Sequence, residues 1–224
     1  MKSVEIIIPV LNEEKSLASS VSKLNSFLDT IGKNYTWIIH IVDNGSEDST
    51  PLVGDELQKK FTKVKFSRLP ERGRGRAIKY AWTTSKSDIV GYMDVDLSTD
   101  IKSIDTLVDS IASNEYLVAT GSRLMKKSEV IGRTLKREII SRCYSLLVRL
   151  TFRISILDFQ CGFKFLNGDT ARKIVPLIVD KGWFFDTELI LLAHSLNYDI
   201  NEVPVRWVDD PDSRVKIIST AWED

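Results

Sequence analysis

Four nearly continuous apolar runs alternate with helix-like segments across the first hundred residues, and this alternation constrains the fold more than any other feature. The runs are residues 4–10, 37–42, 64–69 and 89–93. The segments between them, residues 14–31, 48–61 and 74–85, repeat apolar side chains at the helical period. Ser46 and Asp48 supply cap-type residues before the second segment. Because such strands are typical of sheets covered on both faces, the pattern predicts an α/β fold with a Rossmann-like, mostly parallel sheet flanked by helices.

The second half of the chain is less regular but continues the same kind of pattern. It predicts strands at residues 116–120, 162–166 and 200–207 and helices at residues 135–154 and 184–196. No repeat, low-complexity tract or long linker divides the sequence. We therefore expect one domain over residues 1–224.

Composition excludes several classes of protein. The chain carries 31 Lys and Arg against 31 Asp and Glu and is 43% hydrophobic, which disfavours both a disordered protein and bulk attraction to nucleic acid. Cys143 and Cys161 do not have the spacing of a zinc site or a disulfide framework. No apolar stretch has the length of a membrane span or a secretory signal. We therefore expect a cytoplasmic protein.

Ligands of parallel sheets bind beyond the carboxyl ends of the strands, so the residues after each run are the candidate site. Asp94 and Asp96 follow the fourth run. Two carboxylates one residue apart can hold Mg²⁺ or Mn²⁺ against a diphosphate, because these hard cations prefer oxygen ligands. A second Asp-x-Asp, at residues 210–212, lies in a polar stretch and is interpreted as a solvated pair. Only Asp94 and Asp96 are predicted to bind metal.

Two further groups lie at the same predicted edge. Asp43 can accept a hydrogen bond from a nucleobase or ribose, or it can be a turn residue before the next helix. The run Arg72-Gly73-Arg74-Gly75-Arg76 follows the third strand, where the backbone at Gly73 and Gly75 and a helix N-terminus could approach a phosphate. Its three arginines would add positive charge for that phosphate. A dinucleotide fingerprint would need glycine at Ile78 and would follow the first strand, so a nicotinamide enzyme is disfavoured.

Seven short motifs cover nearly the whole chain in order. They are Pro9-Val10-Leu11-Asn12-Glu13-Glu14, Ile41-Val42-Asp43-Asn44-Gly45-Ser46-Glu47-Asp48-Ser49-Thr50, Asp94-Val95-Asp96-Leu97-Ser98, Gly121-Ser122-Arg123, Asp158-Phe159-Gln160-Cys161-Gly162-Phe163-Lys164, Phe185-Asp186-Thr187-Glu188 and Glu202-Val203-Pro204-Val205-Arg206-Trp207. Together they resemble glycosyltransferase family 2, of GT-A fold, and within it the polyprenyl-phosphate (dolichyl-phosphate) glucosyl- and mannosyltransferases.

The resemblance implies a donor site in residues 1–100 and an acceptor site in residues 101–224. It implies nucleotide-sugar contacts from Pro9, Leu11, Glu13, Asp43 and Ser98, with Asp94 and Asp96 on the metal and diphosphate. A loop closing over the donor diphosphate is expected near Arg214, although a solvated polar tail is the alternative for that stretch. The run at residues 160–164 is more similar to the glucose branch, which favours UDP-glucose over GDP-mannose.

Residues 121–154 carry nine basic residues against two acidic ones, a net charge of +7. The apolar residues of this segment recur at helical spacing and are Leu135, Ile139, Cys143, Leu146, Leu147, Leu150 and Ile154. Such a helix can lie on an anionic membrane surface, or it can pack its apolar stripe on the sheet. The resemblance implies that Arg123, Arg137 and Ser141 hold the acceptor phosphate.

These features predict an inverting, metal-dependent transfer of a hexose to a polyprenyl or dolichyl phosphate at the cytoplasmic membrane face. A phosphate dianion attacks without a base, and Asp186 and Glu188 are the candidates if one is required. Two alternatives remain. One is a soluble family 2 enzyme acting on a sugar hydroxyl, and the other is a catalytically silent nucleotide-sugar or lipid-binding module. The sequence does not indicate an oligomeric state.

Overall fold

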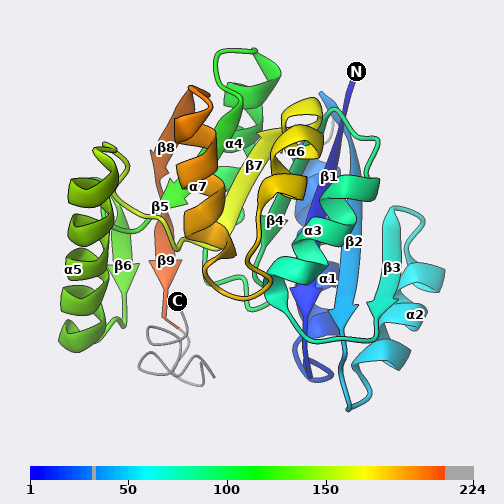
Figure 1. Ribbon diagram of the computed structural model, residues 1–224. Helices are drawn as coiled ribbons and strands as arrows, with labels where there is room; N and C mark the ends of the chain where they lie inside the picture. Colours follow the sequence, from blue (N-terminus) through cyan, green and yellow to red (C-terminus); the bar gives the residue numbers. More distant parts are fainter. Residues whose placement is uncertain (32–33, 210–224) are drawn as a thin grey trace.

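The computed structural model describes residues 1–31 and 34–209. Its strands are β1 (Lys2–Val10), β2 (Tyr35–Asn44), β3 (Val64–Leu69), β4 (Ile89–Met93), β5 (Val118–Ser122), β6 (Glu129–Ile131), β7 (Phe163–Asn167), β8 (Ile200–Pro204) and β9 (Arg206–Val208). Its helices are α1 (Leu17–Ile31), α2 (Thr50–Lys60), α3 (Arg74–Thr84), α4 (Ser103–Ala112), α5 (Leu135–Phe152), α6 (Gly168–Ile174) and α7 (Phe185–Ser195), with a 3₁₀ turn at Val175–Leu177. The predicted α/β class is confirmed (Figure 1).

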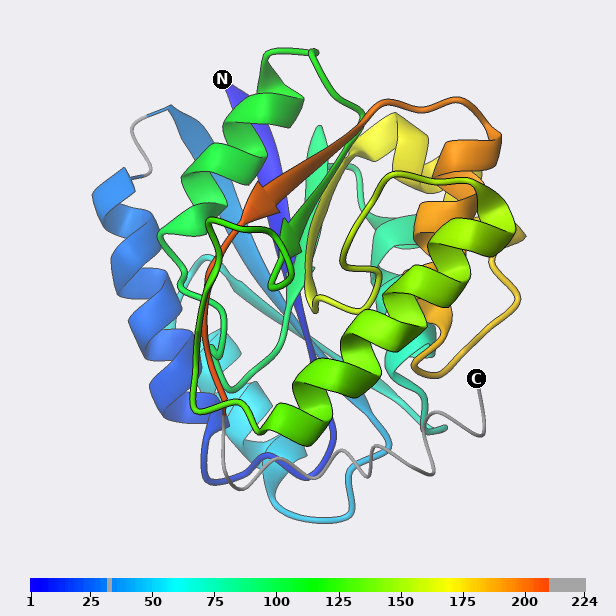
Figure 2. The same ribbon diagram turned by 90° about the vertical axis from the view of Figure 1, so that its left-hand side faces the viewer.

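Seven strands form one sheet in the order β3-β2-β1-β4-β7-β5-β8. All neighbouring pairs are parallel except those of β7, which runs antiparallel to both β4 and β5. One core cluster packs residues of α1, α2 and α4 on the sheet, and a second packs residues of α3, α6 and α7. Figure 2 shows these helices as layers on opposite sides of the sheet. This covering explains why a central strand such as β4 is apolar and buried along its whole length.

The structure corrects the prediction at residues 200–207. These residues form two strands rather than one, because the chain leaves the main sheet after Pro204 and pairs β9 with β6 in a separate two-stranded sheet. Val205, at the break, is buried. Helices α4 and α6 and strand β6 have no counterpart among the predicted elements. β6 has three residues, too few for a periodic signal.

The ends of the strands bring distant parts of the sequence together. β1, β2, β4 and β5 end at Val10, Asn44, Met93 and Ser122, and the predicted site residues lie in the last residues of these strands or directly after them. The antiparallel β7 begins at this same edge, so the loop before it, residues 158–162, joins the group. Helix α5 lies at the β8 end of the sheet, away from β3 and α2 (Figure 1). This edge therefore holds the candidate site.

Candidate active site

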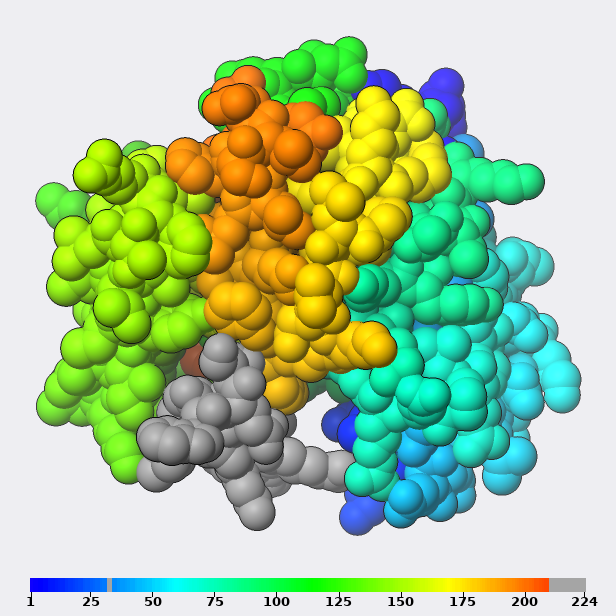
Figure 3. All heavy atoms as spheres, in the orientation of Figure 1, coloured from blue at the N-terminus to red at the C-terminus, as the bar shows by residue number. Residues whose placement is uncertain are grey.

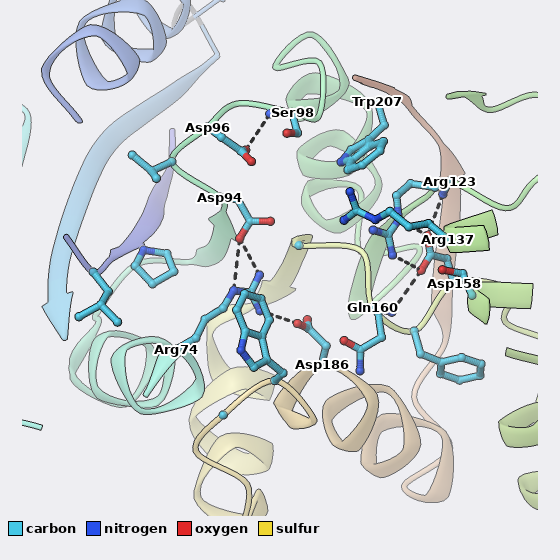
Figure 4. A pocket seen from close by; sticks show the side chains of 18 of the residues that line it. Arg74, Asp94, Asp96, Ser98, Arg123, Arg137, Asp158, Gln160, Asp186 and Trp207 are labelled. Carbon is cyan, nitrogen blue, oxygen red and sulfur yellow. Dashed lines mark hydrogen bonds and ion pairs between the residues drawn. The ribbon is translucent and has the colours of Figure 1, made fainter. Parts of the chain in front are cut away.

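A cavity of about 1110 Å³ opens at the carboxyl edge of the sheet. Its lining includes Asp94 and Asp96 after β4 and Arg123, Arg137 and Ser141 from the second half. Figure 4 shows the two aspartates on one side of the cavity and Arg123 and Arg137 on the other. Residues that were assigned to separate donor and acceptor sites thus share one space.

Four of the residues expected to contact the nucleotide sugar, Pro9, Leu11, Glu13 and Ser98, also line this cavity. The backbone N–H groups of Asn12 and Glu13 donate to the hydroxyls of Ser46 and Thr50, which fixes the loop after β1 on the start of α2. Arg214, together with residues 210–212, lies outside the residues that the structure describes.

Asp43 is not among the residues that line the cavity. Its side chain is fully buried, with Oδ1 accepting from the Ser46 N–H at 3.1 Å and Oδ2 at 3.2 Å from Nε of Arg68. Oδ2 has no hydrogen-bond donor among the described residues. The structure therefore shows Asp43 as a turn residue, whereas its contact with a nucleobase or ribose stays a prediction.

Only part of the glycine-rich run at residues 72–76 lies at the cavity, where the sequence predicted that it would bind a phosphate. Gly73 lines the cavity, but Gly75 does not. The N–H groups of Gly75 and Arg76 donate to the carbonyls of Gly182 and Lys181, so the N-terminus of α3 is occupied by its own chain. A Cβ on Gly75 would lie 2.9 Å from Cβ of Phe185, so this glycine permits close packing. The prediction that Gly75 and this helix end bind a phosphate is not supported.

Arg74, between the two glycines, was expected only to add positive charge for a phosphate, but in the structure it pairs with two carboxylates. Its guanidinium is nearly buried and donates to Oδ1 of Asp94 from Nη2 at 2.7 Å and from Nε at 3.2 Å. Its Nη1 donates to Oδ2 of Asp186 at 2.6 Å. The rings of Tyr92 and Trp183 lie at 4.9 and 5.1 Å from the guanidinium carbon. Arg74 therefore fixes Asp94 to the floor of the cavity.

Asp186 lines the cavity but is poorly suited to act as a base. It accepts hydrogen bonds from Arg74, from Nζ of Lys164 at 2.7 Å and from the hydroxyl of Tyr92. Burial would raise the pKa of this carboxyl, but the charges of Lys164 and Arg74 outweigh it and hold the pKa below its usual range. A carboxylate with a lowered pKa and saturated oxygens is a weak proton acceptor.

Glu188, the second candidate base, is not among the residues that line the cavity. Its two carboxylate oxygens accept the N–H groups of Val179 and Asp180, both at 2.8 Å. The side chain holds the loop before α7 in place, and the sequence pattern could not distinguish this role from a catalytic one.

Asp94 and Asp96 are the candidate metal ligands, and their surroundings test the fit. Both carboxylates line the cavity, and Asp94 is partly exposed. A Cβ on Gly162 would lie 2.0 Å from Oδ2 of Asp94, so glycine at this position leaves room for the carboxylate. Within residues 1–31 and 34–209, no three His, Cys, Asp or Glu side chains gather to hold a metal alone. Two carboxylates fit a cation whose remaining ligands come from a diphosphate and from water.

On the opposite wall, three arginines surround the ring of Trp207. The guanidinium carbons of Arg123, Arg133 and Arg137 lie 5.6, 5.9 and 5.9 Å from the ring centroid. Arg123 forms a bidentate pair with Asp158, at 2.8 and 2.9 Å. Burial alone would raise the pKa of Asp158, but Arg123 lowers it to about 2. Neither Trp207 nor Arg133 was assigned to the site from the sequence. Trp207 was expected in a strand of the main sheet but lies on β9, which pairs with β6 instead, and Arg133 lies in the loop between β6 and α5.

Helix α5 does not pack its apolar stripe on the sheet. Leu147 and Leu150 are 65% and 71% exposed, and Leu135, Ile139 and Leu146 are also more than half exposed. The buried residues of the helix are Ser145 and Val148, on another face. Ile154, predicted to belong to the stripe, is buried beyond the end of the helix. Figure 3 shows α5, in yellow-green, as one outer flank of the molecule. The alternative in which this stripe packs on the sheet is therefore wrong.

Comparison with solved structures identifies the fold. The crystal structure of glucosyl-3-phosphoglycerate synthase from Mycobacterium tuberculosis in complex with UDP is similar with a TM-score of 0.70 at 17% identity, covering 98% of this chain and 75% of that chain. The same synthase in complex with Mn²⁺ and UDP-glucose also gives a TM-score of 0.70 at 17% identity, covering 98% and 74% of the two chains. The fold therefore defines a protein of the GT-A class.

Sequence comparison identifies the family. Residues 5–174 match glycosyl transferase family 2. The chain is 31% identical over 216 residues to the glycosyltransferase AglD of Haloferax volcanii and 30% identical over 229 residues to a dolichyl-phosphate beta-glucosyltransferase of Dictyostelium discoideum. These matches cover 96% and 97% of this chain but only 34% and 70% of the two relatives. The chain belongs to glycosyl transferase family 2, as its motifs indicated, and it is a glycosyltransferase.

Proposed function

We propose that this protein transfers a hexose from a nucleotide diphosphate sugar to a polyprenyl or dolichyl phosphate, with inversion at the anomeric carbon. The observation that carries the proposal is the single cavity with Asp94 and Asp96 on one side and Arg123, Arg137 and Ser141 on the other. Two anionic groups must meet for this reaction, and each wall suits one of them. Relatives with about 30% identity that are named dolichyl-phosphate beta-glucosyltransferases support the same acceptor.

On the donor side, Pro9, Leu11, Glu13 and Ser98 would contact the nucleotide sugar. Asp94 and Asp96 would hold Mg²⁺ or Mn²⁺, which neutralises charge on the leaving diphosphate when it is bound. Arg74 keeps Asp94 oriented from below. The names of the relatives favour glucose over mannose, and we therefore propose UDP-glucose as the first donor to test.

On the acceptor side, the phosphate oxygen would form a bond to the anomeric carbon as the bond from that carbon to the diphosphate breaks. A phosphate monoester has a second pKa near 6, so it is mainly a dianion at pH 7 and has no proton to lose. This accounts for a cavity in which the buried carboxylate Asp186 is tied to Arg74 and Lys164. Arg123 and Arg137 would orient the phosphate through their guanidinium groups.

We also propose that α5 binds the cytoplasmic face of an anionic membrane. Among the described residues no helix is long and apolar enough to span a bilayer. The contact that we propose for α5 is with the membrane surface. The exposed leucines of α5 are flanked by basic residues, among them Lys136, Arg149 and Arg153. Apolar side chains bordered by Lys and Arg match a surface of anionic lipid. The helix would then lie beside the cavity that receives the lipid phosphate, because Arg137 and Ser141 belong to it.

The division of labour between residues 1–100 for the donor and 101–224 for the acceptor is part of the same proposal. The test is an assay with UDP-glucose and GDP-mannose, a short polyprenyl phosphate, and Mg²⁺ or Mn²⁺. A labelled product that extracts with lipid and has the β configuration supports the proposal. Transfer to a free sugar hydroxyl without a lipid product would favour the soluble enzyme. Donor binding without any turnover would favour the silent module.

A further inference from the structure

Arg133 is a buried cationic side chain in the cavity wall for which nothing above gives a function. It lies in the loop between β6 and α5, and its side chain is only 6% exposed. It lines the cavity together with Arg123 and Arg137 and shares the ring of Trp207 with them. A buried charge is costly unless its surroundings compensate it, so its partners decide what it does.

The partners of Arg133 leave it incompletely satisfied. Its Nη2 donates to the hydroxyl of Ser141, and its Nη1 lies 3.1 Å from Oε2 of Glu138 without forming a hydrogen bond. Its Nε has no hydrogen-bond acceptor among the described residues. Arg123, in contrast, uses two nitrogens in its pair with Asp158. Buried donors without acceptors are rare in folded proteins and indicate a missing partner.

The counter-ion of Arg133 is also shared. Glu138 accepts a hydrogen bond at 2.6 Å from Nε of Arg142, which reaches it from the exposed side of α5. Glu138 therefore divides its charge between two arginines, whereas Arg137 pairs with Asp209 separately, at 2.5 Å. Of the three arginines around Trp207, Arg133 is the one with the weakest pairing. An anion entering the cavity would supply the missing acceptor.

We propose that Arg133 is a third binding residue for the phosphate of the acceptor, donating through Nε and Nη1 beside Arg137 and Ser141. The ligand is a phosphate monoester, carried either by a lipid or by a small soluble molecule. This inference rests on the proposed function for the identity of the acceptor but not for the anion site itself. In this proposal Arg133 contacts the substrate directly. If its role were only structural, it would form the ion pair with Glu138 and would not touch the substrate.

The test measures binding by calorimetry with three probes: a short-chain polyprenyl phosphate, glycerol phosphate, and UDP with Mn²⁺. Arg133→Met should weaken binding of the phosphate monoesters by about 10- to 100-fold, the usual cost of losing hydrogen bonds to a charged group. Binding of UDP should stay within about twofold. Arg133→Lys should fall in between, because an ammonium group keeps the charge without the planar fork. Arg142→Met is the matched control, because Arg142 pairs with the same Glu138 from outside the cavity.

A gain of affinity provides a test that misfolding cannot imitate. Glu138→Gln removes the carboxylate that competes for Arg133, so phosphate should bind more tightly than to the unmodified protein. The inference is overturned if Arg133→Met binds phosphate like the unmodified protein, or if it loses UDP and phosphate equally. If the unmodified protein binds glycerol phosphate but not the polyprenyl phosphate, the lipid acceptor is refuted, and Arg133 is still judged with the soluble probe. If the unmodified protein binds neither phosphate monoester, both the lipid acceptor and the role of Arg133 are refuted.

Discussion

The guanidinium of Arg74 donates two hydrogen bonds to a single carboxylate oxygen of Asp94, at 2.7 and 3.2 Å. The other oxygen, Oδ2, is the one that lies against Gly162. Because the third nitrogen of Arg74 is bound to Asp186, the arginine cannot turn away without breaking a buried ion pair. The first carboxylate of the Asp94/Asp96 pair is thus held in a fixed orientation before any ligand enters.

Replacing Arg74 by Met should lower both activity and stability. The variant leaves Asp94 without its anchor and deprives Asp186 of one of its two cationic partners, so we expect a loss of roughly 3 kcal/mol in the free energy of unfolding. Urea denaturation measures the loss. Arg76→Met is the control on the same helix, since Arg76 pairs with Glu71 instead. Equal stabilities of the two variants would contradict the anchoring role.

Asp96→Ala should abolish transfer while leaving the fold intact. Asp96 is exposed to the cavity and is absent from the hydrophobic core, so its loss should reduce turnover by about 100-fold or more without lowering the melting temperature. The binding of Mn²⁺ in the presence of UDP should fall in parallel. Asp100→Ala, outside the cavity on the same loop, should keep activity. Full turnover by Asp96→Ala at saturating donor would refute the metal site.

Arg137→Ala should act on the acceptor and spare the donor. Arg137 lines the wall opposite Asp94 and Asp96, so we expect its loss to raise the acceptor KM and lower kcat by at least about tenfold. The Kd for UDP, measured without acceptor, should change little. Lys60→Ala, at an exposed position on α2 away from both the cavity and α5, is the control. Loss of UDP affinity to the same degree would move Arg137 to the donor site.

Removing exposed leucines from α5 should weaken membrane binding. Replacing Leu147 and Leu150 by Ser should lower binding to anionic vesicles by at least about tenfold, since each leucine contributes up to about 2 kcal/mol when fully buried in lipid. Leu52→Ser is the control, because Leu52 is 66% exposed on α2, at the far end of the sheet. Binding should also decrease in 1 M salt, where the Debye length falls to about 3 Å. Equal sedimentation of all variants would argue for a solvated face.

The pair of Arg123 and Asp158 should make stability depend on pH in acid. The folded-state pKa of Asp158 is about 2, below its model-peptide value of 3.8, so its contribution is complete above pH 4 and is lost as the pH falls toward 2. The difference in unfolding free energy between the unmodified protein and Asp158→Asn should therefore shrink from pH 5 to pH 2, by about 2 kcal/mol. A constant difference across this range would show that the Asp158 pKa is not depressed.

The strand and helix order of the first half could be predicted because its signals are local. β3 and β4 have the bounds that their apolar runs indicate, and α3 begins at Arg74 as expected. The positions of Asp94, Asp96 and Leu11 at the sheet edge follow from the same rule, since parallel strands end on one side. The family could likewise be recognised from motifs in order.

Contacts between side chains from distant elements required the tertiary structure. Whether Asp186 is a base or the partner of Arg74 and Lys164 depends on side chains 112 and 22 positions away. The helical period of α5 shows that one face is apolar, but only packing through Ser145 and Val148 decides that this face points outward. Residue types and periodicity determine which elements form, because these depend on neighbours along the chain. Which charged side chains pair depends on how those elements pack, and this packing cannot be read from neighbouring residues in the sequence.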